Sequence, residues 1–142
     1  MLRGVPSAIS PDLMHVLMSM GHGDEIVFAD GNFPAATHAT RLVRADGHGV
    51  PAILAAVAQF LPLDAYVDDN TVVMATVEDV PEPPIWQQFR DILAQAEGEA
   101  VALTPIERYA FYARANDAFA VVATGESAVY ANLILKKGVV VA

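Results

Sequence analysis

The sequence contains no cysteine, and its basic residues are scarce. Its 142 residues include eight lysines and arginines against 17 aspartates and glutamates, which gives a formal net charge of −9. Without cysteine, disulfide bonds and thiolate chemistry are excluded. The acidic balance argues against nucleic acid or an anionic membrane as a partner, because both are bound largely through clustered positive charge.

Long hydrophobic runs are also absent, although 54% of the residues are hydrophobic. No apolar stretch reaches the roughly 18 residues that span a bilayer, and we expect no signal peptide because the N-terminus lacks a long apolar core. Only 18% of the residues are charged, so part of the apolar surface is expected to lie in subunit contacts. The composition predicts a cytoplasmic protein with one domain, residues 1–142.

Motifs for cofactors and metals are missing as well. The sequence has no GxGxxG, no P-loop, no GxSxG and no HExxH. His38 and His48 fall in predicted loops, without the three or four ligands that a zinc site needs. We therefore expect neither a cofactor nor a metal.

Hydrophobic periodicity predicts helices and strands in alternation, which is typical of a single three-layer α/β/α domain. The predicted helices are residues 11–20, 50–60, 85–97 and 105–116. The predicted strands are residues 26–29, 40–43, 71–77, 118–123 and 129–135. Ser10 is the predicted N-cap of the first helix.

Three local expectations follow from spacing. The segment Thr104-Pro105-Ile106-Glu107 has the pattern of a capping box, with Thr104 as N-cap of a helix on which Arg108 and Tyr112 share a face. Trp86 is expected at an edge or an interface. The methionines of the first helix are expected to pack in the core: Met14, Met18 and Met20.

The stretch from Met20 to Pro34 carries the main candidate residues. His22 lies between two glycines, a short buried strand follows, and Asp30 comes directly after it. Ligands of open α/β sheets bind beyond the carboxyl ends of strands, and a His with an Asp can move protons near neutral pH. Alternatively, the His is a capping or solvent-facing residue and the Asp forms an Asx-turn.

The distance between His22 and Asp30 poses a difficulty. A strand advances roughly 3.3 Å per residue, so the five residues between Glu25 and Ala29 separate its ends by about 16 Å. The two side chains share a site only if the glycine loop folds back or if two subunits contribute.

Two further groups have the chemistry to hold a hydroxylated ligand. Tyr130 and Asn132 are two residues apart, so a strand here projects both from one face. Arg108 near a helix N-terminus can add positive potential to a site that reads sugar oxygens. The alternatives are a wet sheet face for the pair and a solvated arginine.

Several segments together match one family, in order and with little room for insertions: Met20–Val27, Ala29–Asp30, Asn32–Ala35, Arg44–Gly47, Leu61–Asp64, Glu107–Tyr112, Thr124–Glu126 and Tyr130–Val139. In these segments the sequence resembles the fucose mutarotase / ribose pyranase family. Asn32-Phe33-Pro34, Arg44–Gly47 and Glu107-Arg108 are similar to its fucose-type branch.

The resemblance implies interconversion of the α and β anomers of L-fucose without a cofactor, in ring-built homo-oligomers, expected to be decamers, with sites near subunit boundaries. It implies His22 as the acid/base residue. The implied sugar contacts are Asp30, Arg108, Tyr130, Ala131 (through its backbone) and Asn132. Our hypothesis is that His22 shuttles the proton and that Asp30 orients it or holds a hydroxyl, with Tyr130 as an alternative second proton carrier.

Two other functions remain open at this point. One is D-ribose pyranase activity, which is related ring chemistry on a different sugar. The other is a sugar-binding assembly without turnover.

Overall fold

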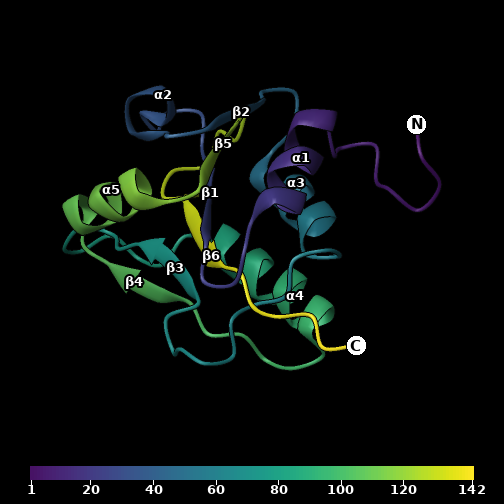
Figure 1. The fold of residues 1–142 in the computed structure, drawn as a ribbon. Helices are drawn as coiled ribbons and strands as arrows, with labels where there is room; N and C mark the ends of the chain where they lie inside the picture. The colour runs from purple at the N-terminus through teal and green to yellow at the C-terminus, as the bar shows by residue number, and fades with distance from the viewer.

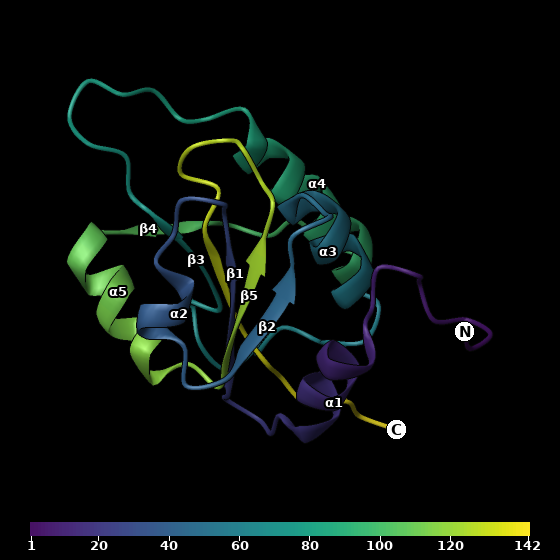
Figure 2. The ribbon, with the colours of Figure 1, turned by 90° about the horizontal axis from the view of Figure 1, so that it is seen from above.

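The computed structural model describes all 142 residues and consists of one six-stranded sheet between two layers of helices (Figure 1). The strands are β1 (Glu25–Ala29), β2 (Leu42–Ala45), β3 (Thr71–Met74), β4 (Thr104–Ile106), β5 (Ala120–Thr124) and β6 (Leu133–Lys136). The helices are α1 (Pro11–Ser19), α2 (Ala35–His38), α3 (Val50–Val57), α4 (Ile85–Glu97) and α5 (Arg108–Asp117). In Figure 2, α1, α3 and α4 lie on one face of the sheet and α2 and α5 on the other, which confirms the α/β/α prediction.

The strand order is β2-β5-β1-β6-β3-β4. β1 runs parallel to β5, β3 runs parallel to β4, and β6 is antiparallel to both of its neighbours. The carboxyl ends of β1, β3 and β4 therefore meet the amino end of β6 at one edge of the sheet. The segment that precedes β1 lies at the opposite edge.

The central strand β1 is buried on both faces. Ile26 and Phe28 belong to the larger core cluster, under α1, α3 and α4, whereas Val27 and Ala29 belong to the smaller one, under α2 and α5. This alternation follows from the two-residue period of a strand. Among the helices, none has both the length and the apolar composition of a membrane span.

Several predicted boundaries agree with the structure. Ser10 caps α1 through a hydrogen bond from the backbone N–H of Leu13 to its Oγ (3.1 Å). Gly98 ends α4 in the left-handed conformation, with a φ of 76°. The third predicted strand stops at Met74 instead of Val77, and the helix predicted over 50–60 ends at Val57.

The capping-box prediction at Thr104 was wrong. Thr104–Ile106 forms β4, an outermost strand of the sheet that pairs only with β3. An edge strand tolerates Pro105, whose missing N–H costs no ladder hydrogen bond there. Glu107 is the N-cap instead, since its carboxylate accepts from the N–H groups of Tyr109 (2.8 Å) and Ala110 (3.1 Å).

The last strand also begins later than predicted. β6 starts at Leu133, and Tyr130 has a left-handed backbone with a φ of 55°. Tyr130 and Asn132 therefore do not project from one face of a strand. They belong to the turn that leads into it.

Two expectations about apolar side chains need correction. Trp86 is buried, with 5% of its surface exposed, and does not lie at an edge or an open surface. Met20 packs in the core as expected, but Met18 is 81% exposed on α1.

Arg114 ties α5 to the start of β1. Its guanidinium donates to the Glu25 carboxylate (2.8 Å) and to the Asp69 carboxylate (2.9 Å), and Arg114 and Glu25 are largely buried. The two carboxylates lie 44 residues apart in the sequence, so this ion pair network joins distant segments.

Replacing Arg114 with methionine is expected to lower the free energy of unfolding by about 2–4 kcal/mol, because Glu25 would remain buried without a partner. Chemical denaturation measures the change. Arg90→Met is the control, since its partner Glu82 is half exposed and such pairs contribute less than about 1 kcal/mol. Equal losses in the two variants would contradict this role for Arg114.

Candidate active site

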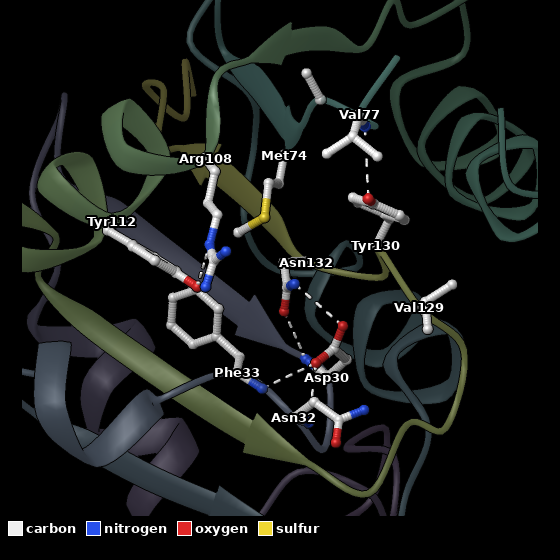
Figure 3. A pocket seen from close by; sticks show the side chains of 11 residues that line it. Asp30, Asn32, Phe33, Met74, Val77, Arg108, Tyr112, Val129, Tyr130 and Asn132 are labelled. Atoms are coloured by element: carbon white, nitrogen blue, oxygen red, sulfur yellow. Dashed lines mark hydrogen bonds between the residues drawn. The ribbon is translucent and has the colours of Figure 1, made fainter. Parts of the chain in front are cut away.

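A pocket of about 370 Å³ lies at the sheet edge where β1, β3 and β4 end and β6 begins (Figure 3). Its lining residues come from all of these ends: Asp30, Asn32, Phe33, Met74, Ala75, Val77, Arg108, Tyr112, Val129, Tyr130 and Asn132. Small-molecule pockets are typically about 300–1,000 Å³. This one is therefore of a size for a small ligand such as a monosaccharide.

Asp30 and Asn132 form a reciprocal pair on the pocket floor. The backbone N–H of Asp30 donates to Asn132 Oδ1 (2.8 Å), and Asn132 Nδ2 donates to Asp30 Oδ2 (3.1 Å). Asp30 Oδ1 also accepts from the N–H groups of Asn32 and Phe33, both at 3.0 Å. Asp30 thus forms the Asx-turn of the alternative interpretation and lines the pocket as well.

Burial raises the pKa of the Asp30 carboxyl above its ordinary value. Hydrogen bonds from the backbone N–H groups of Asn32, Phe33 and Ala131, and from the Asn132 amide, offset part of that effect. A carboxyl group whose pKa is raised by burial and lowered by hydrogen-bond donors is typical of functional sites.

The turn before β6 supplies three of the predicted residues. The Tyr130 side chain lines the pocket, and its hydroxyl accepts from the backbone N–H of Val77 (3.4 Å). Ala131 is fully buried and its N–H contacts the Asp30 carboxylate. The structure therefore brings Tyr130 and Asn132 together at one pocket, although not through the strand geometry that predicted it.

Arg108 is the first residue of α5 and extends over the pocket (Figure 3). Its Nε donates to the Tyr112 hydroxyl (3.1 Å), which raises the pKa of the guanidinium further, so the group is charged at all relevant pH values. The Tyr112 ring stacks on the His38 ring, with centroids 4.8 Å apart. The predicted shared face of Arg108 and Tyr112 is confirmed, and it fixes one side of the guanidinium.

An apolar wall faces these polar groups, and no pattern in the sequence predicted it. Met74 is the last residue of β3. Val77 and Val129 lie in loops, and they are 61% and 62% exposed. Asn32 and Phe33 also line the pocket without having been singled out as contacts. Hydrophobic loop residues look alike in a sequence whether they cover a core or a ligand.

His22 lies at the opposite edge of the sheet, beside Asp64. The imidazole is 49% exposed, and its Nε2 lies 3.2 Å from Asp64 Oδ1. Hydrogen bonds to the carboxylate from the Tyr66 N–H and from His22 lower the pKa of Asp64. An ionised carboxylate only accepts hydrogen bonds, so Nε2 of His22 carries the proton.

The backbone around Lys137 explains how His22 and Asp64 meet. The N–H of Gly23 donates to the Lys137 oxygen (2.8 Å), and the N–H of Asp64 donates to the Lys136 oxygen (3.0 Å). The end of β6 is thus flanked by both segments. Asp64 was not predicted as a site residue because 42 positions separate it from His22.

Within one chain, the pocket contains Asp30, Arg108, Tyr130 and Asn132 but not His22. The glycine loop does not fold back along β1, because it is bound to the end of β6. Within one chain, His22 and Asp30 therefore do not share a site. No group of three or more His, Asp or Glu side chains is placed to hold a metal ion.

Comparisons with known proteins agree over nearly the whole chain. A family model described as the RbsD / FucU transport protein family matches residues 3–140. The human fucose mutarotase is 51% identical over 145 aligned residues, which cover 97% of this chain and 94% of the human protein.

Solved structures give the same result. The fucose mutarotase of Streptococcus pneumoniae, crystallised in complex with L-fucose, superposes with a TM-score of 0.94 at 46% identity, covering 99% of this chain and 100% of that one. RbsD of Bacillus subtilis, complexed with D-ribose, shares the fold at 21% identity with a TM-score of 0.77, covering 99% and 100% of the two chains. The protein is a member of the RbsD / FucU family.

Proposed function

We propose that this protein is an L-fucose mutarotase, an isomerase that interconverts the α and β anomers of the sugar by general acid/base catalysis without a cofactor. The observation that carries the proposal is the pocket itself, with its Asp30–Asn132 pair, Arg108 and Tyr130. It occurs in a chain about half identical to the human fucose mutarotase. We further infer that residues 1–142 act as one domain and that the protein works in the cytoplasm.

The pocket offers complementary surfaces for this sugar. L-Fucose has several ring hydroxyls and one methyl group. Asp30, Asn132 and Arg108 supply acceptors and donors for the hydroxyls, while Met74 and Val77 form an apolar surface for the methyl group. D-Ribose has no methyl group to bury there.

Mutarotation opens and recloses the sugar ring, and protons are the only groups transferred. The anomeric hydroxyl loses a proton, the ring oxygen gains one, and the bond between C1 and the ring oxygen breaks. The open aldehyde rotates about the C1–C2 bond, and the ring closes with the protons returned. Positioned acid/base groups typically accelerate such steps by about 10²–10⁴-fold.

His22 is suited to these transfers in its present tautomer. With Nε2–H donating to Asp64, the unprotonated Nδ1 is left to accept a proton from the anomeric hydroxyl. The half-exposed ring is accessible from outside its own chain. Asp64 is the orienting group in this scheme, because its ionised form stabilises the imidazolium that results.

A neighbouring subunit is proposed to bring His22 to the pocket. The His22 edge exposes Met18 and Tyr66, and the pocket edge exposes Val77 and Val129. Two different apolar edges on one chain favour a head-to-tail contact, which generates a closed ring when the rotation between neighbouring subunits closes. The expected assembly is a ring-built homo-oligomer, a decamer.

The other residues hold the sugar in this scheme. Asp30 accepts a hydroxyl, Arg108 donates to sugar oxygens, Asn132 keeps Asp30 in place, and Ala131 acts through its backbone. Tyr130 borders the ring and is the alternative second proton carrier, because its hydroxyl has only one long hydrogen bond within the chain.

Exchange NMR on a panel of sugars tests the function. Saturation transfer between the anomeric protons of L-fucose is expected to accelerate with protein, and transfer between pyranose and furanose forms of D-ribose is expected to change little. Faster exchange with D-ribose would favour the pyranase. Binding of L-fucose without exchange would favour a sugar-binding assembly.

D-Arabinose serves as the matched probe for the apolar wall, because it has the ring hydroxyls of L-fucose without the methyl group. Its affinity is expected to be about fourfold lower, from roughly 0.8 kcal/mol for one buried methyl-sized group. Equal affinities would contradict the placement of the methyl group against Met74 and Val77.

The raised pKa of Asp30 predicts a pH dependence of sugar binding. The ionised carboxylate accepts more strongly from a hydroxyl than the protonated carboxyl group does, so affinity for L-fucose should fall as the pH drops through a midpoint above the ordinary aspartate value of about 3.9. Calorimetry in the His22→Ala variant measures this affinity in a protein that lacks the imidazole.

The raised pKa of Asp30 has the opposite effect on the stability of the fold. A carboxyl whose pKa is raised by folding destabilises the fold once it ionises, and this effect disappears as the pH falls below both its folded and its unfolded pKa. Unfolding caused by Asp30 therefore does not account for lost binding in acid. An affinity for L-fucose whose midpoint lies at or below the ordinary aspartate value of about 3.9 would contradict the role of burial.

A further inference from the structure

The turn that aims the pocket residues has a backbone conformation that tyrosine rarely adopts. Tyr130 has a φ of 55°, in the left-handed region where a Cβ atom meets the following carbonyl group. Glycine is the usual residue at such positions. A tyrosine persists in this conformation only where its surroundings hold the turn.

Trp86 contacts this turn directly. It is the second residue of α4, it is buried, and its indole Nε1–H donates to the backbone oxygen of Tyr130 (2.9 Å). A buried indole N–H needs an acceptor, and this carbonyl group is the one it has. The hydrogen bond links α4 to the residue with the unusual φ.

The other side of the turn is anchored at Asp30. The N–H of Ala131 and the side-chain amide of Asn132 both bind its carboxylate. The Tyr130 phenol extends across the pocket rim to Val77, as Figure 3 shows. The turn is therefore fixed at α4 on one side and at the end of β1 on the other.

We propose that Trp86 is a positioning residue for the sugar pocket, whose indole N–H holds the left-handed turn at Tyr130 and so aims the phenol at the bound sugar. Trp86 does not line the pocket, and it acts only through Tyr130. The inference rests on the proposed function, because its consequence is measured on L-fucose.

Trp86→Phe keeps a buried aromatic ring and removes only the N–H donor. Losing one such hydrogen bond is expected to lower kcat/KM for anomer exchange of L-fucose about three- to tenfold. Phe89→Leu is the matched control, since Phe89 is fully buried on the same helix and has no polar group. This control is expected to lose stability and keep kcat/KM.

A second background separates positioning from packing. In Tyr130→Gly, glycine adopts the left-handed conformation without help and has no phenol to aim, so adding Trp86→Phe is expected to cause no further loss in L-fucose affinity. An equal loss of affinity in both backgrounds would overturn the proposal. So would a Trp86→Phe variant with unchanged kcat/KM.

The single tryptophan of the chain provides a direct readout if Trp86→Phe does not fold. Its indole N–H gives one cross-peak in a ¹H–¹⁵N spectrum, expected to shift in Tyr130→Gly and on addition of L-fucose. A cross-peak that moves in neither case overturns the proposal. A wild-type protein that binds L-fucose and shifts this peak without accelerating exchange refutes the mutarotase activity and leaves the positioning role supported.

Discussion

His22→Ala is expected to lower the rate of L-fucose anomer exchange by about 10²–10⁴-fold, the usual contribution of a general acid/base. The imidazole is half exposed and its one polar contact is Asp64, so the free energy of unfolding should change little. Saturation-transfer NMR and chemical denaturation measure the two quantities on the same sample.

His15→Ala is the matched control for this experiment. His15 lies exposed on α1 and does not line the pocket. Its replacement is expected to leave the exchange rate unchanged. An exchange rate in His22→Ala equal to that of the wild type would remove the imidazole from the mechanism.

Asp30→Asn is expected to lower the exchange rate by about 10–100-fold and the free energy of unfolding by about 1–3 kcal/mol. The carboxylate accepts two backbone N–H groups at one oxygen and the Asn132 amide at the other. An amide at position 30 has only one acceptor atom. In either orientation, its NH₂ group faces another donor.

Adding Asn132→Asp restores the pairing. The new carboxylate at position 132 accepts from the side-chain amide at position 30. It also accepts from the backbone N–H of position 30, which donates to Asn132 Oδ1 in the wild type. Stability should therefore recover in the double variant. Exchange should stay low, because the negative charge has moved away from the place where the sugar hydroxyl is bound.

The double variant separates the structural role of the pair from its chemical role. If exchange recovers together with stability, then Asp30 contributes only to folding. If neither recovers, the reciprocal hydrogen bonds are not the reason for the loss.

Strong local patterns predicted the fold well. The buried run Ile26–Ala29, the cap at Ser10 and the helix over residues 85–97 each depend on a few neighbouring residues, and the structure confirms all three. The capping-box prediction at Thr104 failed because strand pairing, a tertiary interaction, outweighed the local capping pattern. Its capping pattern was complete, but the open edge of β3 took Thr104–Ile106 as a strand.

The candidate site was predictable in part. Asp30 follows a predicted strand, a position that chain order alone indicates, and Tyr130 and Asn132 reach the same pocket. Arg108 was expected near a helix N-terminus, where it lies, but the strand β4 that precedes it was not predicted. Asp64 and Trp86 were beyond reach, because their contacts to His22 and Tyr130 span 42 and 44 positions. The left-handed backbone at Tyr130 has no signal in a sequence that places tyrosine there.

Complementation between two impaired variants tests most directly whether His22 of one subunit serves the pocket of another. His22→Ala keeps an intact pocket, and Asp30→Asn keeps an intact imidazole. Co-expression in equal amounts should assemble mixed rings in which about a quarter of the sites combine both intact parts, since each part is present with a probability of one half. Exchange of L-fucose is then expected to return to about a quarter of the wild-type rate, whereas no recovery in mixed oligomers would contradict a site shared between subunits.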